Sequence, residues 1–223
     1  MKVRVKICGL ASEAALDAAI EAGADALGFV LAPSPRRVSH ERARELLARV
    51  PAEIEKIAVF ARATGEEIAA ALELDFDGIQ AESAGPEIPE LPRGVFFLPV
   101  IRDGAGLLQR LGGFPSIRSP LANERSLRGA HVLDGPLGGG RGIPVDEQRA
   151  RRAAQSRRLV LAGGLTPENV AARLCAIRPF GVDTSSGVES ERGLKDPERI
   201  RAFVAAVRAV EVELSSSSAE IHT

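Results

Sequence analysis

Cys8 is the first side chain in the sequence that could transfer a proton. It lies in the segment Lys6-Ile7-Cys8-Gly9-Leu10, and in a strand it would share one face with Lys6, roughly 6–7 Å away. A nearby ammonium group favours the thiolate form of a cysteine, which a general base requires. If both side chains point inward, Lys6 needs an opposite charge, and Asp183 is the candidate. The alternative is that Cys8 is a small buried hydrophobic residue.

Arginines and small residues elsewhere in the sequence could bind anions. The loop Ser34-Pro35-Arg36-Arg37 carries paired arginines, and a guanidinium can hold a planar carboxylate through two hydrogen bonds. The alternative is a solvated surface pair. The segments Ala162-Gly163-Gly164-Leu165 and Thr184-Ser185-Ser186-Gly187 each end a late apolar run. Loops of small residues at these two places predict a phosphate site, the alternative being two tight turns.

Asp134 ends another apolar run and is followed by Gly135 and by the glycine-rich segment Gly138-Gly139-Gly140-Arg141-Gly142. Backbone N–H groups of glycines can approach an oxyanion closely. An aspartate in this position therefore indicates a functional site. The alternatives are that Asp134 caps a helix and that the glycines form a flexible turn.

Short apolar runs and helical stretches alternate along the 223 residues. The expected strands are Val3–Ile7, Ala26–Val30, Lys56–Phe60, Gly78–Gln80, Val95–Ile101, Ala130–Leu133, Leu159–Ala162 and Gly181–Thr184. The expected helices are Ser12–Ala22, Ser39–Arg49, Gly65–Leu74, Val145–Gln155, Pro167–Ala176 and Pro197–Val210. Strands separated by helices imply right-handed crossovers and a parallel sheet. Eight such units predict an α/β fold, a small (β/α)8 TIM barrel, with its active site at the carboxyl ends of the strands.

The fourth and fifth helices are expected to be short or irregular. Residues 83–93 contain three prolines, and residues 103–128 are interrupted by two adjacent glycines and a proline. We expect a single barrel domain over residues 1–212. The polar, serine-rich segment over residues 213–223 is expected to be a disordered tail.

Composition and charge exclude several classes of protein. The chain has 29 basic and 30 acidic residues, a net charge of −1, eight Phe, and no Trp or Tyr. Neither a basic field nor stacking surfaces are available for nucleic acid. No run approaches the roughly 18 apolar residues of a membrane helix. We therefore expect a cytoplasmic enzyme or small-molecule binder, with no nucleic-acid or membrane partner.

The cysteines and histidines do not predict a metal site. Two cysteines cannot form a disulfide framework or a four-ligand zinc cluster, and three scattered histidines make a histidine-rich site implausible. Cys175 is expected in the core, within its helix. His131 is expected to face the helices in a structural role, and His40 is expected to be exposed.

At these residues the sequence resembles the phosphoribosylanthranilate isomerase family. The resemblance extends from the first strand to the last helix. It is carried by Lys6-Ile7-Cys8-Gly9-Leu10, Gly28-Phe29-Val30, Ser34-Pro35-Arg36-Arg37-Val38-Ser39, Leu133-Asp134, Leu161-Ala162-Gly163-Gly164-Leu165-Thr166-Pro167-Glu168-Asn169-Val170, Val182-Asp183-Thr184-Ser185-Ser186-Gly187-Val188-Glu189 and Gly193-Leu194-Lys195-Asp196.

The resemblance implies a (β/α)8 barrel of tryptophan biosynthesis that catalyses an Amadori rearrangement of a phosphorylated sugar–anthranilate substrate. It implies Cys8 as general base, Asp134 as general acid and Arg36 as the ligand of the anthranilate carboxylate. The phosphate would be held by Gly139, Gly140, Gly142, Gly163, Gly164, Ser185, Ser186 and Gly187. No metal or cofactor is expected, and the chain is expected to be a monomer or a homodimer.

The chain departs from the family pattern at four places. Ala11 stands where a threonine usually follows the first motif, and Val145-Asp146-Glu147 replaces the segment with an aromatic pair after the glycine-rich loop. The family's Gln-Leu-His-Gly after the fourth strand is Gln80-Ala81-Glu82-Ser83 here, and Arg141 replaces a threonine of the glycine-rich loop. These departures leave two alternatives to the isomerase. One is a related phosphosugar isomerase or aldolase-type barrel with a different ligand. The other is a barrel that binds a phosphosugar without catalysis.

Overall fold

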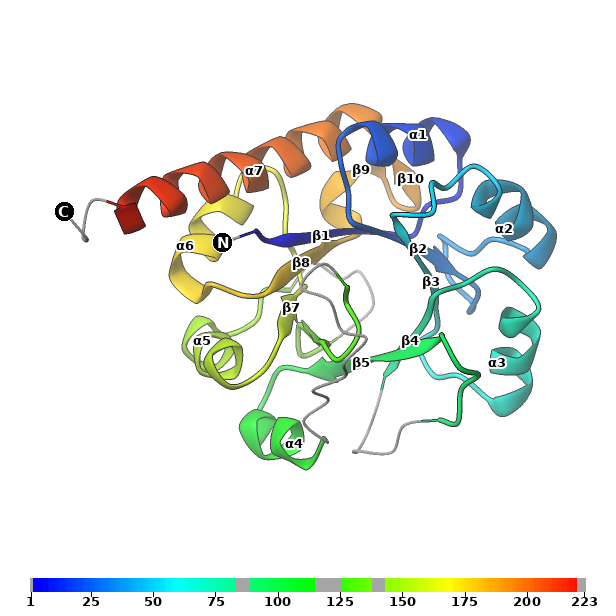
Figure 1. Cartoon of the computed structure of the whole chain (residues 1–223), viewed down its shortest axis with the longest axis horizontal. Helices are drawn as coiled ribbons and strands as arrows, with labels where there is room; N and C mark the ends of the chain where they lie inside the picture. Colours follow the sequence, from blue (N-terminus) through cyan, green and yellow to red (C-terminus); the bar gives the residue numbers. More distant parts are fainter. Residues whose placement is uncertain (1, 83–88, 115–125, 138–142, 220–223) are drawn as a thin grey trace.

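The computed structural model describes residues 2–82, 89–114, 126–137 and 143–219. Within them, eight parallel strands close into a barrel in sequence order, with helices around the outside (Figure 1). The predicted (β/α)8 barrel is confirmed. The strands are β1 (Arg4–Cys8), β2 (Ala26–Val30), β3 (Glu55–Val59), β4 (Gly78–Glu82), β5 (Phe96–Arg102), β6 (His131–Asp134), β7 (Leu159–Leu161) and β8 (Gly181–Thr184).

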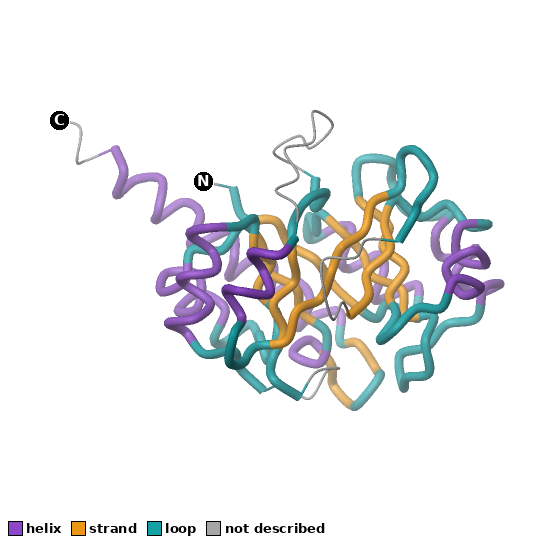
Figure 2. Tube along the Cα trace, turned by 90° about the horizontal axis from the view of Figure 1, so that it is seen from below, coloured by secondary structure: helices purple, strands orange, loops and turns teal. Residues whose placement is uncertain are grey.

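The helices flank the strands in a side view of the chain (Figure 2). No helix in the described part of the chain is long and apolar enough to cross a membrane. A 3-10 turn, η1 (Ser186–Val188), and a hairpin of β9 (Glu189–Glu191) and β10 (Leu194–Lys195) follow β8. The helices are α1 (Glu13–Glu21), α2 (His40–Leu47), α3 (Gly65–Leu72), α4 (Leu107–Gly113), α5 (Glu147–Ser156), α6 (Val170–Ile177) and α7 (Pro197–Ala219).

Side-chain caps fix where several helices begin. Ser12, Ser39, Thr64 and Asp146 each accept a hydrogen bond from a backbone N–H of the first turn of α1, α2, α3 and α5. Each bond satisfies an N–H group that the helix itself leaves without a partner. These caps set the length of each βα loop and hence the position of the strand end before it.

The weak helical segments are short in the structure, as the sequence predicts. Helix α4 is only seven residues long, from Leu107 to Gly113. No helix occurs among the described residues between β4 and β5; residues 83–88 and 115–125 lie outside the described part of the chain.

Three expectations about helices are wrong in detail. α7 extends past Val210 to Ala219, so the serine-rich segment is helical up to that residue rather than disordered, and α7 projects beyond the barrel (Figure 1). α6 begins at Val170 rather than at Pro167. Cys175 is exposed rather than in the core, because the buried face of α6 passes through its neighbour Leu174.

Alternation along β1 divides its side chains between the barrel interior and the helix layer. Val5 and Ile7 belong to the apolar layer between barrel and helices, whereas Lys6 and Cys8 point inward. β1 pairs with β8 in register, with Lys6 opposite Asp183, and this pairing closes the barrel. The strand order therefore brings the first and last strands of the barrel together.

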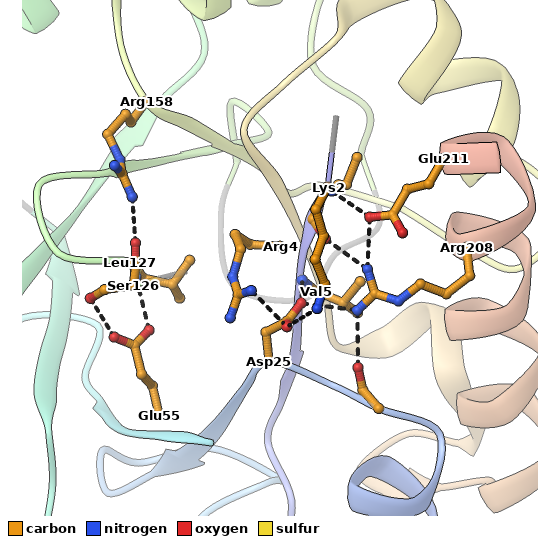
Figure 3. A network of polar contacts seen from close by, with 12 residues as sticks. Lys2, Arg4, Val5, Asp25, Glu55, Ser126, Leu127, Arg158, Arg208 and Glu211 are labelled. Carbon is orange, nitrogen blue, oxygen red and sulfur yellow. Dashed lines mark hydrogen bonds and ion pairs between the residues drawn. The ribbon is translucent and has the colours of Figure 1, made fainter. Parts of the chain in front are cut away.

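A network of ion pairs covers the amino-terminal end of the barrel (Figure 3). The carboxylate of Asp25 contacts Arg4 Nη1 at 2.8 Å, Arg208 Nη2 at 3.0 Å and the backbone N–H of Val5 at 2.9 Å. Arg208 also donates to the carbonyl of Val3 at 2.8 Å. One carboxylate therefore joins β1, the start of β2 and α7, at the barrel face where residues contribute stability rather than catalysis.

We expect Asp25→Ala to lower the free energy of unfolding by about 3–5 kcal/mol, because it removes one partner of a buried ion pair. Urea unfolding would measure the change. The matched control is Asp17→Ala, which removes a carboxylate from an exposed pair with Arg49 and should change stability little. Equal midpoints for both variants would contradict the role given to Asp25.

His131 is buried on the outer side of β6, as predicted, and its ring meets the edge of Phe114 at a centroid distance of 5.0 Å. Burial, with a smaller effect of the nearby Arg157 charge, lowers the pKa of His131 from 6.5 to about 4. The folded protein therefore holds this imidazole neutral at pH values where the unfolded chain protonates it. His40 is exposed, also as predicted.

We expect stability to fall as pH decreases from 6.5 toward 4, because only the unfolded chain binds a proton at His131 over that range. The His131→Phe variant should lose this part of the pH dependence, up to about 3 kcal/mol. Unfolding in urea at several pH values would measure it, with the exposed His40→Gln as control. Parallel pH curves for wild type and His131→Phe would show that the site does not titrate in this way.

Candidate active site

A cavity of about 990 Å³ opens at the carboxyl ends of the strands. It collects most of the side chains that the sequence singles out. Gly139, Gly140, Arg141 and Gly142 lie outside the described residues. The predicted site residues that line the cavity are Cys8, Arg36, Asp134, Gly163, Gly164, Asp183, Ser185, Ser186 and Gly187.

Lys6 lies beneath the cavity floor and is completely buried. Its Nζ atom donates to Asp183 Oδ2 at 2.9 Å, so the ion pair that the sequence predicts is present. Burial opposes the charge on Lys6, but the Asp183 carboxylate and Cys8 outweigh it and raise the pKa of Lys6. The ammonium group is therefore held cationic beside Cys8.

Cys8 is buried at the end of β1. Burial raises the pKa of its thiol, and the positive charges of Lys6 and Lys195 oppose that rise. The sequence predicts the direction of the Lys6 effect correctly but not the larger effect of burial. Burial thus favours the thiol form of Cys8, and the nearby ammonium of Lys6 favours its ionisation.

Arg36 is buried at the cavity wall and forms two hydrogen bonds with Glu189, from Nε at 2.6 Å and from Nη2 at 2.9 Å. Lys195 Nζ donates to the same carboxylate at 2.5 Å. Burial disfavours the Glu189 anion, but the hydrogen bonds from Arg36 and Lys195 lower its pKa to about 2. Glu189 is therefore an anion throughout the neutral range and fixes the orientation of the Arg36 guanidinium.

Asp134, at the end of β6, accepts hydrogen bonds on both carboxylate oxygens. Oδ1 accepts from the backbone N–H of Gly135 at 2.8 Å, and Oδ2 accepts from Arg102 Nη1 at 2.5 Å. Arg102 also forms an ion pair with Glu82 at the end of β4. Three neighbouring strands thus contribute one charged side chain each to the same rim of the cavity.

Sequence reasoning did not identify Arg102 or the contact of Glu189 with Arg36. The strand was expected to end at Ile101, whereas β5 includes Arg102. Arg102 is the next inward-facing position of that strand, so continuing the alternation past Ile101 would have identified it. The Glu189 contact depends on how the β9–β10 hairpin folds over the barrel, which the spacing of residues does not indicate.

The loops after β7 and β8 approach each other closely. Thr184 Oγ1 donates to the carbonyl of Leu165 at 2.7 Å, and Lys195 Nζ donates to the carbonyl of Ser185 at 3.1 Å. At Gly187, a Cβ atom would lie 1.8 Å from the Leu165 carbonyl oxygen, so only glycine fits without a backbone shift. This packing brings the two small-residue loops of the predicted phosphate site together.

No group of three or more His, Cys, Asp and Glu side chains in the described ranges is arranged to hold a metal ion. The side chains that line the described cavity suit proton transfer and anion binding. Cys8 and Asp134 are its candidate proton-transfer groups, and Arg36 and the two small-residue loops are its candidate anion ligands.

Comparison with known proteins relates this chain to one family. The family model described as N-(5'-phosphoribosyl)anthranilate (PRA) isomerase matches residues 5–89 and 111–206. The chain is 39% identical over 218 residues to N-(5'-phosphoribosyl)anthranilate isomerase of Dechloromonas aromatica, covering 93% of this chain and 97% of that protein.

Two solved structures are similar over nearly the whole barrel. One holds monomers of the dimeric phosphoribosylanthranilate isomerase of Thermotoga maritima, with a TM-score of 0.74, 30% identity and coverage of 93% of this chain and 100% of that one. The other is a phosphoribosylanthranilate isomerase in complex with reduced 1-(o-carboxyphenylamino)-1-deoxyribulose 5-phosphate. Its TM-score is 0.71, its identity 28%, and its coverage 93% of this chain and 100% of that one.

We expect Gly187→Ala to lower stability by about 1–3 kcal/mol, because the new methyl group forces the loops after β7 and β8 apart. The thermal protection given by inorganic phosphate should decrease as well. Gly112→Ala is the matched control, since a Cβ atom there meets nothing within 4 Å. A Gly187→Ala protein with unchanged melting temperature and phosphate protection would show that the close approach has no such role.

Proposed function

The chain belongs to the N-(5'-phosphoribosyl)anthranilate isomerase family, and we propose that Cys8 and Asp134 divide the proton transfers of its reaction. The reaction is the Amadori rearrangement of N-(5'-phosphoribosyl)anthranilate to 1-(2-carboxyphenylamino)-1-deoxyribulose 5-phosphate in tryptophan biosynthesis. It opens the furanose ring and shifts a proton from C2' to C1', so the molecule as a whole is neither oxidised nor reduced. The observation that carries the proposal is that a thiol and a carboxyl group from β1 and β6 line one cavity.

Asp134 is the proposed general acid. In its protonated form it donates a proton to the furanose ring oxygen while the bond between C1' and that oxygen breaks. The electron pair of the substrate's own nitrogen forms the C=N bond of an iminium ion. The step therefore requires neither a lysine Schiff base nor a redox cofactor, and Asp134 leaves it as a carboxylate.

Cys8 is the proposed general base. The cationic iminium acidifies the proton on C2', and the Cys8 thiolate removes it to give an enolamine that tautomerises to the ketone. Burial disfavours the thiolate form of Cys8, and the charge of Lys6 favours it. The two groups differ in environment: Cys8 is buried, and Asp134 is partly open to the cavity.

Arg36 is the proposed ligand of the anthranilate carboxylate. Glu189 occupies the Nε–Nη2 edge of its guanidinium, and the Nη1–Nη2 edge can present two parallel N–H groups to a second carboxylate. Binding therefore does not require the Arg36–Glu189 pair to break. A ligand without a carboxylate would not use this edge, which favours the isomerase over a barrel for another phosphosugar.

The substrate phosphate is proposed to bind the loops after β7 and β8, through Gly163, Gly164, Ser185, Ser186 and Gly187. The packing of Gly187 against Leu165 and the hydrogen bond from Lys195 to Ser185 support this placement. Gly139, Gly140 and Gly142 are proposed to contribute on the basis of the family resemblance. We further propose that the chain acts in the cytoplasm, as a monomer or a homodimer.

We expect Cys8→Ser and Asp134→Asn each to lower kcat by about 10²–10⁴-fold, because each removes one proton-transfer group. Turnover of N-(5'-phosphoribosyl)anthranilate can be followed by anthraniloyl fluorescence, since the chain has no Trp or Tyr to interfere. Cys175→Ser is the matched control, because that cysteine is exposed on α6. Undiminished turnover in both Cys8→Ser and Asp134→Asn would refute the assigned roles.

A further inference from the structure

The fourth strand ends differently here from the family pattern, and the structure connects that difference to the proposed acid. Glu82 occupies the position where the family pattern has histidine. Its Oε1 atom accepts a hydrogen bond from Arg102 Nη2, and Arg102 Nη1 donates to Asp134 Oδ2 at 2.5 Å. A single guanidinium therefore bridges Glu82 and Asp134 across the ends of β4, β5 and β6.

The register of the strands makes this bridge possible. Glu82 lies opposite Val100, and Arg102 lies opposite Asp134, so Arg102 is one inward position beyond the residue that faces Glu82. The three side chains are 20–30% exposed at the cavity rim. They can exchange protons with solvent and still contact a ligand in the cavity.

The contacts of Asp134 suit a carboxylate, whereas a general acid must carry a proton. With Gly135 N–H on Oδ1 and Arg102 on Oδ2, both oxygens of Asp134 act as acceptors. A carboxylic acid needs one of those oxygens to donate instead. When Asp134 carries the proton that the proposed reaction uses, one of these two oxygens becomes a donor, and the Arg102 side chain can move away more easily than the backbone N–H of Gly135.

Other charged groups face Asp134 less directly. Asp183 of β8 is close enough for the two carboxylates to repel each other. Asp183 is itself paired with Lys6 of β1, next to Cys8. Asp103, after β5, is bound by Arg149. The end of β7 offers only Ala162 and the glycines that follow it.

We propose that Arg102 and Glu82 form a positioning pair that controls the protonation of Asp134. Arg102 donates to the side chain of Asp134 in the observed geometry. Glu82 keeps Arg102 paired when Asp134 takes up its proton, which lowers the cost of forming the acid. The inference rests on the proposed role of Asp134, and neither Arg102 nor Glu82 exchanges a proton with substrate.

The test is the pH dependence of kcat/KM in Glu82→Gln and Arg102→Met. In Glu82→Gln, Arg102 has only Asp134 as an anionic partner in this trio, so the carboxylate is favoured. The limb of the kcat/KM profile that reports the protonation of Asp134 should move to lower pH by about one unit, and turnover at neutral pH should fall. In Arg102→Met, the repulsion from Glu82 remains and the same limb should move to higher pH by a similar amount.

The matched control is Glu45→Gln, which removes a carboxylate from an exposed pair with Arg42 on α2 and should leave both limbs in place. If turnover of a variant is too low to follow, the pH dependence of binding the reduced product analogue reports the same shift. Limbs that stay at their wild-type positions in both test variants would overturn the proposal. Full turnover in Asp134→Asn would instead show that the role of Asp134 is wrong.

Discussion

The ion pair between Lys6 and Asp183 is the contact on which the rest of the molecule depends. Lys6 is completely buried in the barrel, and its ammonium is tolerable there only with an opposite charge in contact. The same pair spans β1 and β8, where the barrel closes. It also places a positive charge beside Cys8. Closure of the fold and the electrostatics of the proposed base therefore rest on one contact.

The sequence predicted the positions of strand ends well, because parallel strands of a closed barrel all end at one face. That rule was sufficient to predict that Cys8, Asp134 and Ser185 lie in one cavity. The closure of eight strands was sufficient to predict that Lys6 pairs with Asp183. It was not sufficient for Arg102, whose contact with Asp134 depends on the register of adjacent strands. The exposure of Cys175 shows a related limit, since one helical step moves a side chain off the buried face.

The two arginines at the cavity are each held by carboxylates of the protein itself. Arg36 is fixed by Glu189, and Arg102 is shared between Glu82 and Asp134. A guanidinium that is already oriented loses less conformational freedom when a ligand binds, so more of the binding energy remains for positioning the reacting atoms. The carboxylates also reduce the positive charge that would otherwise build up in a cavity for a substrate with a carboxylate and a phosphate.

The separation of Lys6 and Asp183 by 177 positions has a consequence for biosynthesis. While a ribosome extends the chain, β1 and its lysine are available long before the strand that neutralises and covers them. The incomplete barrel has two unpaired strand edges during that time, and both disappear only when β8 arrives. The barrel can therefore close only after β8 has been made.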